Sequence, residues 1–380
     1  MRALLGVSDR TGLSAFAQGL RSRGYELVAT DGTRAALAAD GIPAVAVADV
    51  TGFPEILGGR VKTLHPAIHA GILARRDLPD HMRQLEQRGF SPIDLVAVSL
   101  YPFEQVVERG ASDAEIVENI DIGGPALIRA AAKNGDAVTV VVSPAQYDGV
   151  LTEMATDGGV SSETRRCLAA EALAHVAAYD TAVAHNLRSR CHTPGMPAAL
   201  TVGGPLLQQL RYGENPHQSG GLYRVPGRTA GVANASRLHG PELSFTNWLD
   251  VDTAWRIVAE FDEPAAVIVK HSNPCGFAIG EDAADAYRRA FECDPRSAFG
   301  GVVALNGMLD SAVAAELSAT FLEAVVTSGT TNDALDLVRS RQRLRVLAVT
   351  PNSTGSQLDV RSIDGGLLAQ TVDRTATDTS

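Results

Sequence analysis

The chain has 380 residues, of which 45% are hydrophobic and 20% charged, and its formal net charge is −11 at pH 7. Because single domains usually contain about 100 to 200 residues, this length predicts two folding units with ordinary apolar cores. The acidic balance argues against partners that require a basic surface. We therefore expect binding neither to nucleic acid nor to an anionic membrane.

Signals for targeting and for disulfides are absent from the sequence pattern. The N-terminal apolar run ends at Asp9, which is too early for a signal peptide, and no stretch approaches the ~20 apolar residues of a membrane span. The four cysteines form no CxxC pair, which is typical of a reducing compartment. These features predict a cytoplasmic protein.

Apolar runs and helical patterns alternate through the first part of the chain. A helical face at Leu13, Phe16 and Leu20 follows the first run, and Gly24 is placed to end that helix. Near-continuous apolar strands that alternate with helices predict a parallel sheet covered on both faces, which is an α/β fold. The predicted strands are residues 2–7, 25–30, 45–49, 94–100 and 137–143.

Helix signals mark the rest of this part. Ser112 and Glu115 form a predicted capping box, and Pro125 suits the first turn of a helix that carries the ALIRAAAK run. Residues 161–190 are rich in Ala, Leu, Glu and Arg and predict one long helix that closes the first domain.

A segment rich in proline and glycine separates this part from a second α/β unit. That unit is indicated by buried strands at 264–271 and 300–306. The polar C-terminal end predicts a disordered tail. The predicted division is a first domain at 1–190, a linker at 191–205, a second domain at 206–370 and a tail at 371–380.

Two strand-to-helix corners could bind phosphate. In parallel sheets, ligands bind beyond the carboxyl ends of the strands, often with phosphate at a helix N-terminus. One corner is the GVSDRTG run at residues 6–12, where Arg10 adds charge, and the other is the TDGT run at 30–33. Each one alone is more simply interpreted as a helix cap.

The segment Gly58–Pro66 (GGRVKTLHP) brings two cations, a hydroxyl and an imidazole into one loop of an acidic chain. A solvated basic loop is the simpler interpretation of this segment alone. Further along come SLYPF at 99–103, NIDIGG at 119–124 and a helix that bears Lys133. Tyr101 could be an ordinary core residue, and Asp121 a charge favoured near a helix N-terminus.

In this order, GVSDRTGL, TDGT, TGFPEILGGRVKTLHP, HAGILARR, SLYPF and NIDIGGPALIRAAAKN closely resemble one family. It is the bifunctional purine biosynthesis family, in which aminoimidazole carboxamide ribonucleotide (AICAR) formyltransferase is joined to inosine monophosphate (IMP) cyclohydrolase. The resemblance is collinear over roughly residues 1–370. It implies a methylglyoxal-synthase-like first domain that closes the ring of the formylated AICAR nucleotide and releases water.

The resemblance also implies roles for individual residues. It implies catalytic roles for Lys62, Tyr101, Asp121 and Lys133, with Lys133 as the proton-transfer group and no cofactor for ring closure. The implied phosphate site and nucleotide contacts are Ser8, Asp9, Arg10, Thr30, Asp31, Gly32, Thr33, Arg60, Val61, Thr63, Val98, Ser99 and Ile122.

Five positions depart from the usual pattern of the family. Gly6 replaces a serine, Arg10 a lysine, Asp31 a glycine, Ser99 an asparagine and Gly135 a histidine. A carboxylate at Asp31 opposes phosphate binding unless it turns away. These changes leave open a substrate that is an analogue nucleotide.

The second half carries two further loops with mixed chemistry. LRYGENPHQ at 210–218 packs a cation, an aromatic ring, an amide and an imidazole into a loop fixed by glycine and proline. Lys270 and His271 follow a buried strand, next to Asn273 and Pro274. A lone histidine is more often structural, whereas a Lys-His pair at the end of a strand favours catalysis, and imidazole suits proton transfer near neutral pH.

These loops resemble the formyltransferase half of the same family, which has a cytidine-deaminase-like fold without its zinc. Pro274 and Cys275 match part of the zinc signature, but Ala278 stands at the second cysteine position and no H-x-E precedes it, so no metal is expected. The co-substrate implied is 10-formyltetrahydrofolate. The residues implied are Lys270 and His271 for proton transfer and Arg211, Tyr212, Asn247, Phe299, Gly300 and Glu323 for the nucleotide.

Members of this family usually continue past Gly365–Leu368 into a second deaminase-like lobe with further substrate and folate contacts. We therefore expect a partial formyltransferase domain of doubtful independent activity, in a homodimer that acts on a small ribonucleotide. Two alternatives stay open: a nucleotide-binding scaffold with weak catalysis, and phosphate elimination of the methylglyoxal synthase type.

Overall fold

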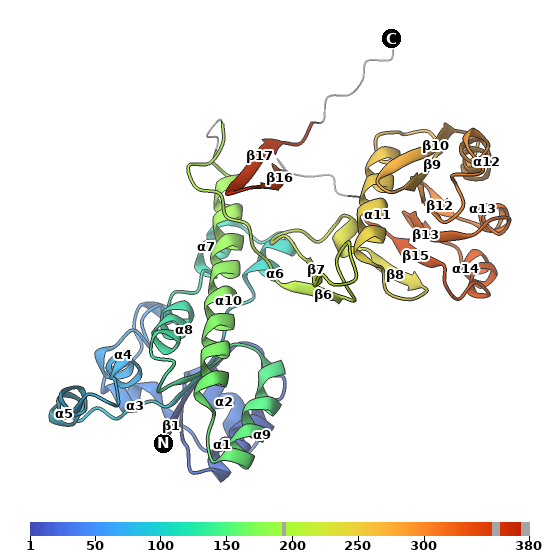
Figure 1. The fold of residues 1–380 in the computed structure, drawn as a ribbon. Coiled ribbons are helices and arrows are strands. Elements are labelled where there is room, and N and C mark those ends of the chain that lie inside the picture. Colours follow the sequence, from blue (N-terminus) through green and yellow to red (C-terminus); the bar gives the residue numbers. More distant parts are fainter. Residues whose placement is uncertain (192–194, 352–357, 374–380) are drawn as a thin grey trace. The chain divides into compact units, whose positions relative to one another are not determined.

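The computed structural model describes residues 1–191, 195–351 and 358–373. The chain forms two compact units, Met1–Asn186 and Leu187–Ser380 (Figure 1). Part of the predicted linker and most of the predicted tail lie outside the described residues, so the domain limits given above stay predictions.

The first unit is built on a five-stranded parallel sheet in the order β3-β2-β1-β4-β5. The chain adds strands on one side of β1 and then crosses over to the other side. The order therefore reverses between β1 and β4, and this is the point where α/β sheets usually bind ligands. The strands are β1 (Arg2–Val7), β2 (Glu26–Ala29), β3 (Val45–Ala46), β4 (Leu95–Ser99) and β5 (Thr139–Val141).

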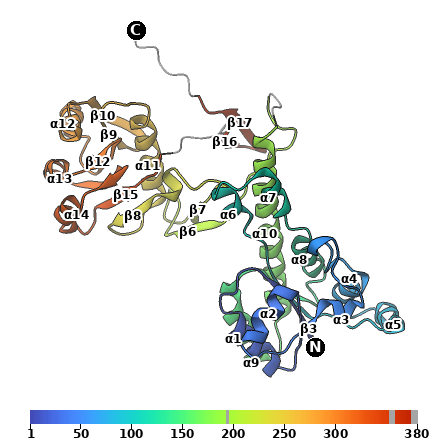
Figure 2. The same cartoon turned by 180° about the vertical axis from the view of Figure 1, so that it is seen from behind.

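Helices cover both faces of this sheet, as continuous burial of strands β1 and β4 requires. Helix α1 packs on α9, and α4 packs on α8, and the two pairs lie on different sides of the sheet in Figures 1 and 2. The helices are α1 (Leu13–Ser22), α2 (Asp31–Ala39), α3 (Val47–Thr51), α4 (Pro66–Leu73), α5 (Pro79–Gln87), α6 (Phe103–Glu108), α7 (Asp113–Glu118), α8 (Gly123–Lys133), α9 (Tyr147–Asp157) and α10 (Ser162–Ser189), with short 3₁₀ turns η1 (Leu57–Gly59) and η2 (Pro144–Gln146).

The predicted strand at 45–49 is wrong in its second half. Only Val45 and Ala46 pair with β2, and the chain becomes helical at Val47. Ala46 faces Ala29, the last residue of β2, so a longer β3 would have no partner for its backbone. The long helix predicted at 161–190 matches α10.

Local capping agrees with the sequence at α7 and at α8. The Ser112 hydroxyl accepts a hydrogen bond from the Glu115 N–H at 3.3 Å, which caps α7. The Glu115 carboxylate accepts a hydrogen bond from Arg109, whereas in a capping box it would accept the backbone N–H of Ser112. Helix α8 begins at Gly123, with Pro125 in its first turn.

The second unit contains a six-stranded mixed sheet in the order β10-β9-β11-β13-β15-β8. Strands β11, β13 and β15 run parallel, and β9 is antiparallel to both β10 and β11. The strands of this sheet are β8 (Ser236–His239), β9 (Ala265–Lys270), β10 (Asn273–Ile279), β11 (Gly301–Leu305), β13 (Leu322–Thr327) and β15 (Arg345–Ala348).

Alternate side chains of β9 divide between two cores. Ala266 and Ile268 pack with α12 (Ala283–Cys293), α13 (Ser311–Leu317) and α14 (Asn332–Arg339), while Val267 and Val269 pack with α11 (Phe245–Val258). This alternation is the period of a strand that is covered on both faces. The remaining elements are β6 (Leu206–Leu210), β7 (Gly220–Tyr223), η3 (Val232–Asn234), β12 (Met308–Leu309), β14 (Gly329–Thr330), β16 (Leu358–Ile363) and β17 (Gly366–Thr371).

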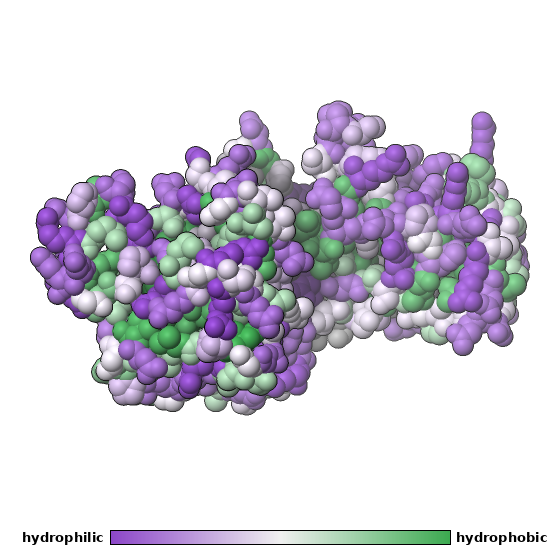
Figure 3. Space-filling model, turned by 90° about the horizontal axis from the view of Figure 1, so that it is seen from below, coloured by the Kyte–Doolittle hydropathy of each residue, from purple (hydrophilic) through white to green (hydrophobic). Residues whose placement is uncertain are grey.

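The surface of the molecule is mixed. Seen from below, hydrophilic and hydrophobic areas alternate over both units (Figure 3). Among the helices in the described part of the chain, none combines the length and the apolar character that crossing a bilayer requires.

Candidate active sites

The loop after β1 is tied to the end of β4 at the point where the strand order reverses. The Ser99 hydroxyl accepts hydrogen bonds from the backbone N–H groups of Ser8 (2.7 Å) and Asp9 (2.9 Å). The Ser8 hydroxyl donates to the Leu100 carbonyl at 2.6 Å. The predicted Ser8, Asp9 and Ser99 therefore meet at one edge of the sheet, with their side chains and amides bonded to one another.

The second predicted corner, after β2, lies beside the first. The buried Thr33 hydroxyl accepts a hydrogen bond from the Val7 N–H at 3.0 Å and contacts the Thr30 hydroxyl at 3.2 Å. An Arg10 guanidinium N–H donates to the Gly32 carbonyl at 3.4 Å. The two corners form one polar surface, because these contacts join the loop after β1 to the N-terminus of α2.

Two carboxylates belong to this surface, Asp9 and Asp31. The Thr11 backbone N–H donates to Asp9 at 2.9 Å, and this hydrogen bonding lowers the pKa of the Asp9 carboxyl. The Asp31 carboxylate is exposed and lies 3.8 Å from the Arg34 guanidinium, one turn along α2. Arg34 therefore offsets part of the Asp31 charge.

A cluster of reactive groups forms where the Gly58–Pro66 segment meets the start of α8. The Lys62 ammonium lies 3.4 Å from the Tyr101 hydroxyl. The Asp121 carboxylate accepts the Gly124 N–H at 2.8 Å. Burial raises the pKa of Asp121, while hydrogen bonds from the Gly124 and Tyr101 backbones and the charge of Lys62 act in the opposite direction.

Two glycines allow this close approach. A Cβ on Gly124 would lie 2.5 Å from an Asp121 carboxylate oxygen and 2.7 Å from a methyl carbon of Leu100. A Cβ on Gly123 would lie 2.8 Å from the Thr63 hydroxyl, which is almost fully buried. The pair of glycines at the start of α8 therefore lets the carboxylate, the β4 loop and the 60–65 loop pack together.

Sequence reasoning missed one residue of this cluster, Tyr179 of α10. Its hydroxyl accepts the Asp121 backbone N–H at 2.7 Å, and it also contacts the Asn119 carbonyl at 3.4 Å. Burial raises the pKa of Tyr179 to about 12. Nothing in the local sequence marks Tyr179, because it follows Asp121 by 58 positions on a helix that reads as ordinary.

The other predicted nucleotide contacts near this segment differ in exposure. Arg60 is exposed and bonds Glu118 of α7, which raises the pKa of the Arg60 guanidinium. Val61 forms an isolated bridge with Ile56. Ile122 is 60% exposed next to Asp121, so an apolar surface is available there, whereas the Val98 side chain is buried in the core.

Lys133 is not brought to the cluster. It is the last residue of α8, which begins at Gly123, so the two ends are separated by about 15 Å along the helix axis. The Lys133 side chain is exposed. The proton-transfer role that the resemblance implies for Lys133 stays a prediction.

In the second unit, Lys270 and His271 lie at a tight turn between β9 and β10. Lys270 pairs with Asn273, and the two residues between them, His271 and Ser272, have φ values of 55° and 58°. Two left-handed residues are typical of a tight hairpin turn, but glycine or asparagine usually occupies such positions. The Lys270 ammonium donates to the Phe299 carbonyl at 2.8 Å.

The other predicted nucleotide contacts near Lys270 lie at the same sheet edge. The Gly300 N–H donates to the Phe321 carbonyl at 2.8 Å, and the rings of Phe299 and Phe321 are 5.4 Å apart. Glu323 falls where the register between β11 and β13 shifts, and its carboxylate bonds Arg345. The predicted Lys270, Phe299, Gly300 and Glu323 are therefore brought together.

Asn247, Arg211 and Tyr212 are held by local contacts. The Asn247 side chain accepts the Ser244 N–H at 3.2 Å in a capping box at the start of α11. The Arg211 guanidinium lies 5.8 Å from the Tyr212 ring centroid. In the described part of the chain, no group of three or more His, Cys, Asp and Glu side chains could hold a metal ion.

Comparisons with known proteins identify the family of this chain. A family model described as an MGS-like domain matches residues 12–126, and one described as AICARFT/IMPCHase bienzyme matches residues 131–380. The bifunctional purine biosynthesis protein PurH of Bacillus cereus (strain G9842) is 46% identical over 382 residues, which span all of this chain and 75% of the relative. The chain belongs to the PurH family.

The PurH of Roseobacter denitrificans is 48% identical over 375 residues, 97% of this chain and 71% of that protein. The solved structure "Crystal structure of ForH" matches 49% of this chain and 98% of its own chain, with 36% identity and a TM-score of 0.44. The predicted family, α/β fold class and enzyme class are confirmed. The formyltransferase activity of the family implies a formyl-tetrahydrofolate co-substrate.

Proposed function

We propose that the carboxyl edge of the first sheet closes the ring of the formylated AICAR nucleotide to give IMP and water. The observation that carries this proposal is the convergence of Lys62, Tyr101 and Asp121 near the start of α8. Three polar groups drawn from three separated segments converge beside an exposed apolar residue, Ile122. This is the chemistry that a nucleotide base with a reacting amide requires.

The reaction forms one C–N bond and removes one water molecule. The carboxamide nitrogen attacks the formyl carbon and loses a proton, while the formyl oxygen gains negative charge and is then protonated. The formamide nitrogen loses a second proton as this oxygen leaves as water and the C=N bond of the ring forms. The Lys62 ammonium, with the Tyr101 hydroxyl beside it, would stabilise the negative charge on that oxygen. The Asp121 carboxylate, whose pKa is raised by burial, would accept the proton from nitrogen.

The nucleotide phosphate would lie on the polar surface formed by the two corners. The N-terminus of α2 and the Arg10 guanidinium supply positive potential there. The Ser99 hydroxyl already holds the amides of Ser8 and Asp9, so phosphate would either bind beside these amides or replace the hydroxyl. Asp31 would turn toward Arg34, as its 3.8 Å contact favours.

For the second unit we propose binding of the AICAR nucleotide at the sheet edge that carries Lys270, Phe299 and Gly300. There, Lys270 and His271 would move the proton as the 5-amino group attacks the formyl carbon of 10-formyltetrahydrofolate. The chain spans 75% of the length of its PurH relative.

We also propose that the protein acts as a cytoplasmic homodimer that binds neither nucleic acid nor membranes. The resemblance and the net charge of −11 support this proposal. Light scattering coupled to size exclusion should give a mass of two chains, and a mass of one chain would contradict it.

Ring closure can be followed by absorbance with the purified full chain and the formylated nucleotide. We expect turnover by the wild type and a loss of about 10²- to 10³-fold in Lys62→Met. Nucleotide binding without turnover in the wild type would instead support a scaffold. Turnover of dihydroxyacetone phosphate would support the elimination chemistry of a methylglyoxal synthase.

A further inference from the structure

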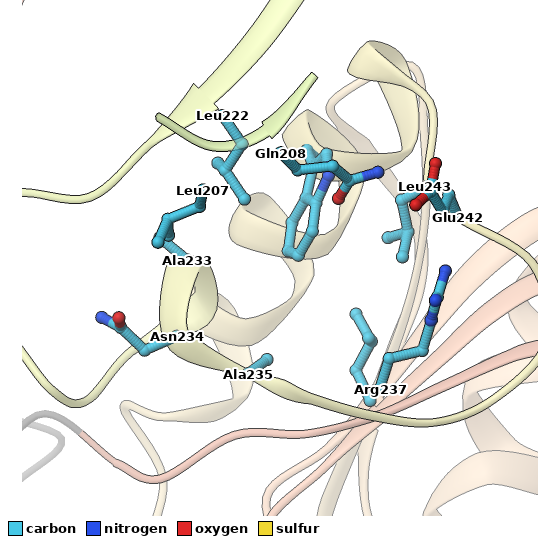
Figure 4. A pocket seen from close by; sticks show the side chains of 11 residues that line it. Leu207, Gln208, Leu222, Ala233, Asn234, Ala235, Arg237, Glu242 and Leu243 are labelled. Carbon is cyan, nitrogen blue, oxygen red and sulfur yellow. The ribbon is translucent and has the colours of Figure 1, made fainter. Parts of the chain in front are cut away.

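A hollow in the second unit has a lining of mixed character. It has a volume of about 360 Å³ and lies between β6, β7, η3, β8 and the start of α11. In this lining Leu243 lies beside Glu242, and Asn234 lies beside Ala233 (Figure 4). Because polar and apolar side chains are intermixed, the lining favours no class of ligand. A more specific arrangement surrounds Tyr179 in the first unit.

The Asp121 backbone lies in a connection without regular structure. Residues 119–122 join the end of α7, at Glu118, to the start of α8, at Gly123. A residue in such a connection has no helix or strand partner for its backbone N–H. The Asp121 N–H is instead bonded to a side chain, the Tyr179 hydroxyl of α10, at 2.7 Å. The placement of the Asp121 carboxylate therefore depends on a residue 58 positions away in the sequence.

The Tyr179 hydroxyl is bonded to both ends of this turn. It accepts the Asp121 N–H, and it donates to the Asn119 carbonyl at 3.4 Å. A hydroxyl that donates must keep its proton. Burial raises the pKa of Tyr179 to about 12, so the hydroxyl stays protonated at neutral pH. One hydroxyl therefore fixes the direction of the backbone on both sides of residue 120.

The ring of Tyr179 packs on the segment that carries Tyr101. The ring centroids of Tyr179 and Phe103 are 6.1 Å apart, and the rings meet edge to face. Phe103 is buried at the start of α6, and its backbone N–H donates to the Tyr101 carbonyl at 2.7 Å. The Tyr101 backbone in turn bonds the Asp121 carboxylate. One side chain of α10 therefore contacts both segments.

We propose that Tyr179 is a positioning residue for ring closure, which holds Asp121 and Tyr101 in their reactive arrangement. This inference rests on the proposed function of the first unit. The hydroxyl directs the Asp121 backbone, and the ring supports the start of α6 behind Tyr101. Displacement of a reacting group by about 1 Å can lower a rate by about 10²-fold. Tyr179 therefore acts on the chemical step through Asp121 and Tyr101, and not on substrate binding.

Tyr179→Phe keeps the ring and removes the hydroxyl. We expect kcat for ring closure to fall about 10- to 100-fold, with KM changed by less than about threefold. Tyr25→Phe is the matched control, because Tyr25 is also half-buried and precedes β2, at the end of the sheet opposite to the site. It should leave both constants unchanged. An unchanged kcat in Tyr179→Phe with an active wild type would overturn the inference, whereas an inactive wild type would contradict the proposed function.

The pH dependence of the rate distinguishes positioning from a general loss of structure. Burial raises the pKa of Asp121, and bonds from the Gly124 and Tyr101 backbones lower it. The charge of Lys62 also lowers this pKa, and the variant leaves that charge in place. Removal of the Tyr179 hydroxyl misaligns the carboxylate, so the backbone bonds weaken and the pKa rises. The limb of the kcat/KM profile that reports this base should move to higher pH, and a lower rate with an unmoved limb would contradict positioning.

Stability gives a readout that does not depend on turnover. Asp121→Asn removes the ionising group, so its effect on the unfolding free energy reports the ionisation of Asp121. We expect the gain from Asp121→Asn near neutral pH to be larger when Tyr179→Phe is also present, and to shrink in both backgrounds below the unfolded pKa. Urea unfolding at several pH values measures it. Equal gains in the two backgrounds would overturn the inference, whether or not the wild type catalyses ring closure.

Discussion

The two predicted sites differ in how their polar groups are used. In the first unit, Lys62, Tyr101 and Asp121 come together with a raised pKa on the carboxyl group. In the second unit, Lys270 already donates to a backbone carbonyl and Glu323 already pairs with Arg345. A shared position at a sheet edge therefore does not make two clusters equally ready to react. Burial opposes the charged form of Asp121 in the first cluster, whereas Lys270 and Glu323 in the second cluster already bond to other protein groups.

The largest expected effect is on the rate of ring closure, which should depend on the first cluster and not on the second. Lys62→Met should lower ring closure by about 10²- to 10³-fold, because it removes the cation next to the developing oxyanion. Lys270→Met should leave ring closure at the wild-type rate, because Lys270 belongs to the other unit. Absorbance assays of both variants provide the measurement, and equal losses in the two would contradict the assignment of ring closure to the first unit.

A backbone contact tests how rigidly the second cluster is held. Gly276→Ala would place a Cβ 1.9 Å from the Ala290 carbonyl oxygen, between β10 and α12. We expect the second unit to lose roughly 1–3 kcal/mol of unfolding free energy, because this contact forces a backbone shift. Urea unfolding followed by hydrogen exchange measures the unfolding free energy of the second unit. Gly307→Ala is the control, because a Cβ at Gly307 would meet nothing within 4 Å.

The turn at His271 offers a smaller test. His271 has a φ of 55°, so His271→Gly should relieve left-handed strain of about 1 kcal/mol, partly offset by the greater freedom of glycine in the unfolded chain. We expect a small rise in the stability of the second unit. A fall in stability would mean that the imidazole makes a stabilising contact that outweighs the strain.

The smallest effect concerns pH. Since burial raises the folded pKa of Asp121 above its ordinary value of 3.8, ionising this carboxyl group costs stability as pH rises from the unfolded pKa through the folded pKa. Asp121→Asn should therefore be more stable than the wild type near neutral pH. The difference should vanish below the unfolded pKa, and denaturant titrations at several pH values would reveal a contrary trend.

Much of this architecture could be predicted from the sequence because the signals are local. The apolar runs at 2–7 and 94–100 gave the two strands that flank the first site, and the glycines at 123 and 124 mark the start of α8. The turn to helix at Val47 depends on where β2 ends, so the pattern of residues 45–49 alone could not reveal it.

The sites were harder to predict than the strands. Tyr179 supports Asp121 only because α10 packs next to the start of α8, and no motif announces such a long-range contact. Asn247 caps α11 by accepting the Ser244 N–H, and Glu323 pairs with Arg345 of a neighbouring strand. No motif marks these two contacts either. A motif specifies which residue types are present, and packing decides which of their atoms remain available for a ligand.

A crystal structure of the full chain with bound IMP tests the central claim most directly. We predict that the purine ring lies against Tyr101 and Ile122 with Lys62 and Asp121 within hydrogen-bond distance, and that the phosphate lies at the start of α2. A purine ring bound away from Lys62 and Asp121 would contradict the assignment of ring closure to this cluster.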